Sequence, residues 1–219
     1  MHSLYIVGIL LLFIALMFLQ AYWEHRRTQA IEAIAPQLGL QFRGNGHDRL
    51  PSVVRSFDLF SKGRSRRVRH VLAGRKAGTD VFLFDYQYTT GSRKHRRTHT
   101  YTVALLWLNN LEVPAFSLSP KNLFHVIGSW FGRQDINFDG YPLFSQHYLL
   151  QGSDEPSIRR IFNPEVFSFY ESRNNACTEG LGNVLIYYYT GGRVEPKYWP
   201  GLLSSAQNVA GLFSRSDAF

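Results

Sequence analysis

An unbroken apolar run opens the chain, from Leu4 to Leu19, and it contains no charged residue and no proline. Tyr22 and Trp23 follow it and lead directly into a polar run that starts at Glu24. About twenty helical residues, at about 1.5 Å of rise each, cross the roughly 30 Å hydrocarbon layer of a bilayer. The run is apolar on every face, whereas a helix on a soluble core is usually amphipathic. We therefore expect a transmembrane helix that includes Leu4, Leu19 and Trp23.

A cleaved secretory signal is the main alternative for this segment. Such a signal has Lys or Arg before its apolar core and small residues at its cleavage site. Here only Met1, His2 and Ser3 precede the core, and the bulky Tyr22 and Trp23 follow it. Aromatic rings at this position are typical of the membrane interface. The pattern favours an uncleaved anchor.

The flanks of the run predict its orientation. Lys and Arg resist translocation, and only the C-terminal flank carries them, as Arg26 and Arg27. We expect the N-terminus outside and residues 24–219 in the cytoplasm. The single cysteine, Cys177, permits no internal disulfide, which is consistent with a reducing compartment.

A juxtamembrane helix is predicted for residues 24–39. Ile31, Ile34, Ala35 and Leu38 share one face at helical spacing, and the glycine at position 39 is a typical helix stop. Pro36 lies late in this segment, so the last turn is kinked or the helix ends just before it.

Strand-like alternation begins further along the chain and is clearest from Val81 to Tyr88, where Phe82, Phe84, Tyr86 and Tyr88 fall on one side. A second strand is predicted from Thr98 to Asn109. The connection between them contains a glycine and several basic residues, so we predict a β-hairpin with a basic tip. The other expected strands cover residues 40–43, 68–74, 115–118, 148–150, 176–179 and 183–190.

Helical spacing recurs between and after these strands. The expected helices cover residues 51–60, 120–131, 155–161, 164–171 and 197–213. Ser153 or Asp154 caps the third of these, and Pro164 begins the fourth. Grouped strands with helices on both sides predict an α+β fold with mainly antiparallel pairing. The expected organisation is an anchor at 1–23, a linker at 24–39 and one domain at 40–219, with a possible sub-boundary near 132–140.

Charge is distributed unevenly over this domain. Residues 24–111 hold sixteen Lys and Arg against six Asp and Glu, a net +10, whereas residues 112–219 hold eight against ten, a net −2. The basic excess thus belongs to the membrane-proximal half. Its two clusters supply our candidate binding residues: Arg64, Arg66, Arg67, Arg69, Arg93, Lys94, Arg96 and Arg97.

Metal and cofactor motifs are lacking in the sequence. No Cys pair or His-Glu-x-x-His is present, and His95 and His99 fall in the predicted hairpin rather than on a helix. No Gly-x-Ser-x-Gly elbow or Gly-Lys-Ser/Thr phosphate loop occurs either. Cys177 is expected to be a partly buried thiol in a strand. We expect no metal and no cofactor.

Asp85 is the one acid with two interpretations. It lies opposite in phase to the aromatic side of its strand, so the simpler interpretation is a charge on the outer face of a half-exposed strand. The other interpretation is a buried acid that serves as the base of an enzyme acting on a membrane-linked anionic substrate.

Three interpretations of the basic clusters remain open. Anionic lipid headgroups attract each nearby Lys or Arg by roughly 1 kcal/mol, and an acidic protein partner would be bound in a similar way. Nucleic acid is the second, with Tyr86, Tyr88 and Tyr101 available for stacking, although no nucleic-acid motif is present. A merely solubilising face is the third.

The anchor, the short helix and the phrase Phe84-Asp85-Tyr86-Gln87-Tyr88-Thr89-Thr90-Gly91-Ser92 before a basic hairpin resemble bacterial single-span membrane proteins with a cytoplasmic domain of unknown function. This resemblance implies a location in the bacterial inner membrane and supplies no catalytic residues. Together, these observations favour a non-enzymatic binding module that uses its basic face toward anionic lipid or an acidic partner.

Overall fold

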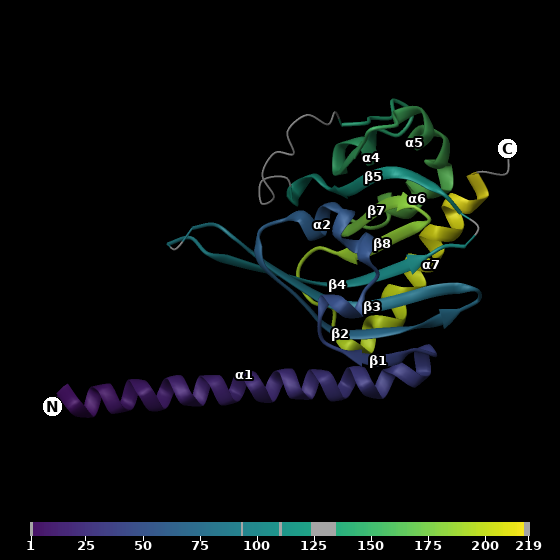
Figure 1. The fold of residues 1–219 in the computed structure, drawn as a ribbon. Coiled ribbons are helices and arrows are strands. Elements are labelled where there is room, and N and C mark those ends of the chain that lie inside the picture. The colour runs from purple at the N-terminus through teal and green to yellow at the C-terminus, as the bar shows by residue number, and fades with distance from the viewer. Residues whose placement is uncertain (1, 93, 110, 124–134, 217–219) are drawn as a thin grey trace.

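A computed structural model shows an α+β domain attached to one long N-terminal helix (Figure 1). It describes residues 2–92, 94–109, 111–123 and 135–216. The expected fold class, an apolar helix followed by an antiparallel sheet with flanking helices, is confirmed.

The first helix, α1, is continuous over 37 residues from His2 to Leu38. It is the one helix in the described parts of the chain that is long and apolar enough to cross a membrane. Its N-terminal half makes no contact that buries it: Leu19 is 51% and Trp23 is 64% exposed. Its C-terminal half packs on the domain through Ile31, Ala35 and Leu38, which are buried. The helical face predicted from the sequence is therefore the face that packs.

Gly39 ends α1 as predicted, and the helix continues through Pro36 instead of stopping before it. Gly39 has φ +68°, its N–H donates to Pro36 O at 3.0 Å, and the N–H of Leu40 donates to Ala35 O at 3.0 Å. This is the paired hydrogen-bond pattern of a Schellman motif, in which a left-handed residue satisfies the last carbonyls.

Replacement of Gly39 by Ala is expected to destabilise the domain by about 1 kcal/mol, because an L side chain is disfavoured at positive φ. A Cβ at this position would meet no atom within 4 Å, so the penalty is purely conformational. Gly211→Ala is the matched control: Gly211 lies inside a helix, also with open space around it, and alanine is expected to stabilise there. Chemical denaturation of the full chain in detergent measures both, and two shifts of the same sign would contradict the assignment.

One eight-stranded sheet forms the centre of the domain, in the order β1-β2-β3-β4-β8-β7-β5-β6. All its described pairings are antiparallel. The first four strands of the chain lie side by side in order, and the last strand, β8, joins them to the other three. The strands are β1 (Gln41–Gly44), β2 (Arg64–Lys76), β3 (Thr79–Thr90), β4 (Arg97–Trp107), β5 (Val113–Pro120), β6 (Tyr148–Gly152), β7 (Ala176–Gly182) and β8 (Val184–Tyr189).

Helices cover both faces of the sheet. One face packs against the end of α1 and against the helices of the second half, and the large buried Trp199 and Phe213 belong to this core. These helices are α4 (Pro142–His147), α5 (Glu155–Ile161), α6 (Pro164–Glu171), η4 (Pro196–Tyr198) and α7 (Trp199–Ser216). The opposite face is covered by a strap of short helices, η1 (His47–Arg49), η2 (Ser52–Ser56) and α2 (Asp58–Ser61).

Most predicted elements exist, and several boundaries differ. The segment predicted as one helix at 51–60 is two short pieces, η2 and α2. Of the helix expected at 120–131, the structure shows the 3-10 turn η3 (Lys121–Leu123), and the remainder lies outside the described residues. Helix α4 was not predicted. Asp154 caps α5, and α6 has the predicted bounds.

Three strands extend beyond the rest of the sheet and form a feature that we call the arm. It consists of residues 64–70 of β2, 85–90 of β3 and 97–102 of β4, with the turn between the last two. Strand β8 pairs with β4 only from Val103 to Trp107, so these residues lack that neighbour. The predicted hairpin with a basic tip is confirmed. The run Arg64–Arg69, which was not predicted as strand before Val68, belongs to β2.

Candidate functional site

The long helix is fastened to the sheet by a buried ion pair between Arg27 of α1 and Asp85 of β3. Arg27 Nε donates to Asp85 Oδ2 at 2.7 Å and Arg27 Nη2 donates to Asp85 Oδ1 at 2.8 Å. Nη2 also donates to the backbone oxygen of Val194 at 2.8 Å. The two side chains are 12% and 4% exposed. A bidentate pair with this burial holds both partners in one geometry.

Further polar side chains surround this pair, and we call the whole cluster the joint. Thr102 Oγ1 donates to Asp85 Oδ1 at 2.7 Å, and His70 Nδ1 lies 3.0 Å from Asp85 Oδ2. The other ring nitrogen of His70 lies 3.0 Å from Thr28 Oγ1 on α1. His70 has φ +54° at an irregularity of β2, a conformation that disfavours L side chains. The strained backbone places its ring between α1 and Asp85.

Glu24 adds a second, more exposed link between α1 and the domain. Its carboxylate lies 2.7 Å from Arg193 Nη1 and 3.7 Å from Arg69 Nη1. Behind the joint, Trp199 Nε1 donates to Val194 O at 3.2 Å, so the carbonyl that accepts from Arg27 is itself fixed. The polar segment of α1 at residues 24–28 thus contacts β2, β3, β4 and the loop before α7.

Asp85 is ionised in this setting. Burial raises the pKa of its carboxyl, but hydrogen bonds from His70 and Arg27 and the charge of Arg27 lower it more, and the pKa lies below its ordinary value. The interpretation of Asp85 as a charge on an exposed outer face was wrong, because the side chain faces α1. Arg27, which the sequence placed among the flanking cations, lies inside the protein, and Arg26 stays exposed.

The joint does not suit the role of a catalytic base for Asp85. Both of its oxygens already accept two hydrogen bonds each, from Arg27, Thr102 and His70. A base needs a free acceptor site that faces a substrate, and a low pKa makes it weaker. Two grooves, of about 310 and 450 Å³, are lined by other residues at the far ends of these strands.

The eight predicted binding residues divide into three groups. Arg69 belongs to the rim of the joint through Glu24. Arg66 donates to the carbonyls of Ser61, Lys62 and Gly63 and so closes the end of α2, which makes it chiefly structural. Arg93 lies outside the described residues. The remaining five lie on the arm and are exposed: Arg64, Arg67, Lys94, Arg96 and Arg97.

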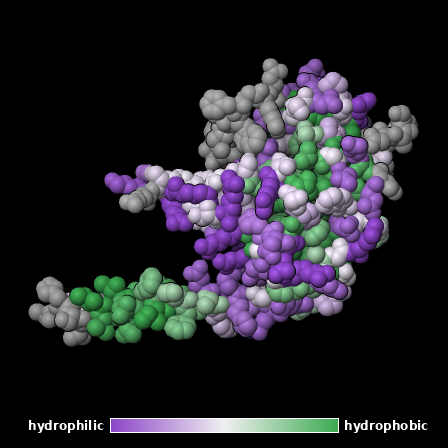
Figure 2. Space-filling model, viewed as in Figure 1, coloured by the Kyte–Doolittle hydropathy of each residue, from purple (hydrophilic) through white to green (hydrophobic). Residues whose placement is uncertain are grey.

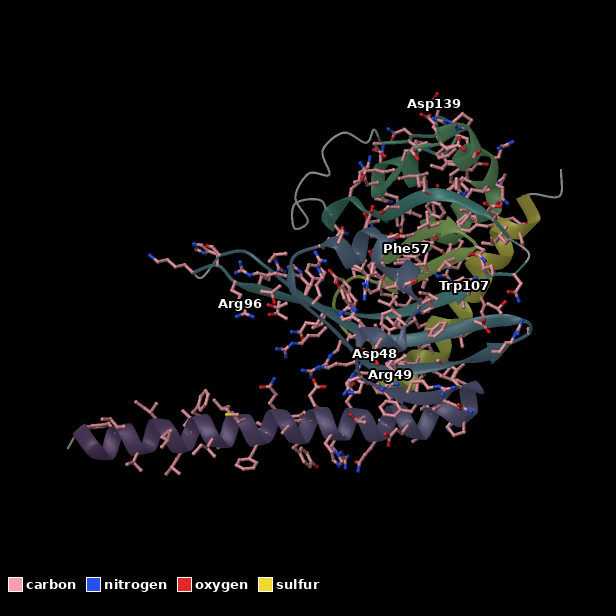
Figure 3. The ribbon with its side chains drawn as sticks, viewed as in Figure 1. Asp48, Arg49, Phe57, Arg96, Trp107 and Asp139 are labelled. Carbon is pink, nitrogen blue, oxygen red and sulfur yellow. The ribbon has the colours of Figure 1, made fainter. Side chains whose placement is uncertain are left out.

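These five arm cations form no ion pair with any carboxylate in the described parts of the chain, although Arg64 donates to the carbonyl of Gly91 at 2.8 Å. Figure 2 shows hydrophilic side chains over the arm and over the neighbouring side of the domain, next to the apolar half of α1. Arg96 lies on the arm, outside the body of the domain (Figure 3). Unpaired cations on a projecting hairpin are free to meet an external anion.

A second buried acid, Glu179 of β7, was not predicted from the sequence. It is 2% exposed, and its oxygens accept from Leu59 N at 3.1 and 3.3 Å and from Tyr188 OH at 3.2 Å. Burial raises its pKa to about 7. This carboxyl fastens the strap to the sheet.

Cys177 lies in a strand, β7, as predicted, but its thiol is fully instead of partly buried, and burial raises its pKa to about 12. His99 stacks on Tyr88 with ring centroids 4.8 Å apart and lies 2.8 Å from Thr90 Oγ1. Among the described residues, no three His, Cys, Asp or Glu side chains are grouped as a metal site would need.

No protein-family model and no curated protein sequence matches the chain. Among solved structures, the fold is similar to the crystal structure of the mycobacterial trehalose monomycolate transport factor A, TtfA. The TM-score is 0.60 at 12% sequence identity, and the match covers 85% of this chain and 93% of that one. At this identity the likeness shows a shared fold.

Proposed function

We propose that this chain is a single-span, membrane-anchored, non-enzymatic module whose domain contacts anionic lipid headgroups through its arm. The joint is the observation that carries the proposal. Because α1 is one unbroken helix and its side chains hydrogen-bond to residues of β2, β3 and β4, we infer that the membrane segment and the domain move as one body. The arm is then held near the bilayer instead of drifting on a flexible linker.

The arm has the chemistry of a headgroup contact. Five exposed cations gather on one hairpin and its neighbouring strand without an ion pair to any described carboxylate, and the cytoplasmic leaflet is anionic. We propose the cytoplasm of a bacterial inner membrane as the location of the domain, with Arg26 as the remaining exposed cation at the membrane flank. The structural neighbour is named as a trehalose monomycolate transport factor, and a role in transport instead of catalysis would fit this proposal.

Lipid is favoured here over an acidic protein partner because the arm and the apolar half of α1 extend from the same side of the domain (Figure 1). A surface that is fixed beside the bilayer meets headgroups at a very high effective concentration. An acidic partner would have to displace them.

The test places a dye on the arm tip of the full chain in nanodiscs. Ser92→Cys provides an exposed thiol there, and the native thiol of Cys177 is fully buried and does not compete. A quencher attached to the lipid headgroup reports contact. We expect stronger quenching in mixed phosphatidylcholine and phosphatidylglycerol than in phosphatidylcholine alone.

Replacement of Arg96 and Arg97 by Gln is expected to reduce the ratio of docked to undocked arm roughly tenfold, since each cation near an anionic surface contributes roughly 1 kcal/mol before screening. Arg75→Gln with Lys76→Gln is the matched control, because these two cations lie at the opposite end of β2. Quenching that is equal with and without phosphatidylglycerol would overturn the proposal. So would an equal loss of quenching in the arm variant and in the Arg75, Lys76 control.

A further inference from the structure

The arm and the apolar half of α1 leave the joint in the same direction and enclose a wedge-shaped space. Both extend beyond the body of the domain on one side (Figures 1 and 3), and Figure 2 shows open space between them. The joint is the apex of this wedge, because Arg27 of α1 contacts Asp85 and Thr102 there.

The lengths of the two sides can be compared from the joint outward. From Asp85 to Thr90 the arm advances by five residue steps, which span roughly 17 Å at about 3.3 Å per step. From Arg27 to Trp23, the aromatic residue that marks the membrane interface, α1 rises only about 6 Å. An arm parallel to α1 therefore passes the level of Trp23 by roughly 10 Å, before its turn is added.

An upright α1 would thus place the tip cations Lys94 and Arg96 at the depth of acyl chains. A cation at the centre of a helix span costs roughly 3 kcal/mol or more, so this arrangement is excluded on energetic grounds. The body must lean until the arm rests at headgroup level, and tilts of up to roughly 40° are normal for single spans. The leaning body sets the wedge directly over the lipid headgroups.

The wall of the wedge on the arm is polar and cationic. Asp85 and Thr102 face α1, and alternation places the next row, Arg67, Gln87 and Thr100, on the same face. These three side chains are exposed or partly exposed. Guanidinium, amide and hydroxyl groups in one row are donors that suit a phosphate.

The wall on α1 is polar at Gln20 and apolar beyond it, toward the N-terminus. Gln20 and Phe13 lie seven and fourteen residues before Arg27, which is two and four turns along the same face of the helix. Phe13 is 59% exposed. A ligand that fits between these walls needs an anionic head and an apolar tail, as an anionic phospholipid has.

We propose that the wedge is a phospholipid site, with a headgroup phosphate on Arg67, Gln87 and Thr100 and acyl chains along the face of α1 that carries Phe13 and Gln20. The site rests on the proposed function, because the arm must lie at headgroup level to form it. The occupant is an anionic phospholipid of the leaflet that α1 crosses.

Photo-crosslinking of the full chain in nanodiscs tests this site. A benzophenone side chain at Thr100 is expected to form adducts with the mass of phosphatidylglycerol in nanodiscs of mixed phosphatidylcholine and phosphatidylglycerol. The control probe at Ser56, an exposed residue of the strap on the other face of the sheet, is expected to form none. Arg67→Gln is expected to reduce the Thr100 adduct about fivefold, since it removes one cation beside the phosphate.

A second variant tests the coupling between the joint and the membrane segment. A four-residue Gly-Ser insertion between Trp23 and Glu24 leaves the joint intact but uncouples it from the membrane segment, so the Thr100 lipid adduct and the headgroup quenching of the tip dye are both expected to fall. In the chain without the insertion, headgroup quenching of the tip dye without a lipid adduct at Thr100 would overturn the wedge and leave the proposed function standing. Adducts to a second copy of the chain would also overturn the wedge, and absence of tip quenching in the chain without the insertion would remove the proposed function itself.

Discussion

Replacement of Arg27 by Met is expected to lower the free energy of unfolding of the full chain by roughly 3–5 kcal/mol. The methionine keeps most of the apolar stem but leaves the carboxylate of Asp85 buried without its bidentate partner. The backbone oxygen of Val194 loses a donor as well. Breaking one side of a buried pair costs far more than the pair itself contributes, because the remaining charge stays desolvated.

Arg26→Met is the matched control for this variant. Arg26 is the adjacent residue on the same helix and has the same charge, but it is exposed. Its replacement is expected to change stability by less than about 0.5 kcal/mol. Urea denaturation in detergent, followed by near-UV circular dichroism, measures both variants, and equal losses for Arg26 and Arg27 would show that the joint does not hold α1.

The pH dependence of stability is an independent test of the Arg27–Asp85 pair. In the wild type the pKa of Asp85 is lower in the folded chain than its ordinary value, so Asp85 contributes stability above the ordinary carboxyl range, and this is lost as the pH falls. Without Arg27, burial raises the pKa of Asp85 with less opposition from neighbouring groups. We therefore expect the stability difference between wild type and Arg27→Met to shrink as the pH falls.

The local pattern of the chain was sufficient for most of its elements. Alternation at Phe82, Phe84, Tyr86 and Tyr88 placed β3 correctly, since a period of two is imposed by the strand itself. Helix ends were equally local: Gly39 ends α1, and the Asp154 side chain accepts from Ser157 N to start α5. Such signals lie within a few residues of the feature that they specify.

The joint could not be predicted in this way, because its partners are distant in sequence. Arg27 and Asp85 are 58 residues apart, and Arg27 and Val194 are 167 apart. In the sequence alone, Arg27 is one of several cations after an apolar run. The phase of Asp85 opposite the aromatic face was a usable signal. It indicates which side of the strand the acid occupies, but not that α1 covers that side.

The neighbouring arginines show the same limit. Arg66 and Arg67 are adjacent and identical in type, yet Arg66 closes the end of α2 while Arg67 stays exposed on the arm. The difference arises from the side of β2 that each occupies relative to the strap. Composition identified the basic half of the domain, and only the tertiary arrangement separates its structural cations from its free ones.

Glu179 is expected to make the domain less stable as the pH rises from about 4.5 to about 7. Its pKa is raised from the ordinary 4.5 to about 7 by burial, so the folded chain binds one more proton than the unfolded chain between these values. By linkage, stability falls across this window and is constant above it. The shift corresponds to a loss of about 3 kcal/mol.

Glu179→Gln is expected to abolish most of this dependence and to exceed the wild type in stability by up to about 3 kcal/mol at pH 8, with little difference near pH 4.5. The amide oxygen still accepts from Leu59 N, and the amide nitrogen donates to Tyr188 OH, so the strap stays fastened. Glu112→Gln, at an exposed position, is the control and should leave the profile unchanged. Urea denaturation across this pH range measures the free energy of unfolding of each variant. If that of Glu179→Gln still fell as steeply with pH as that of the wild type, the titrating group would be another residue.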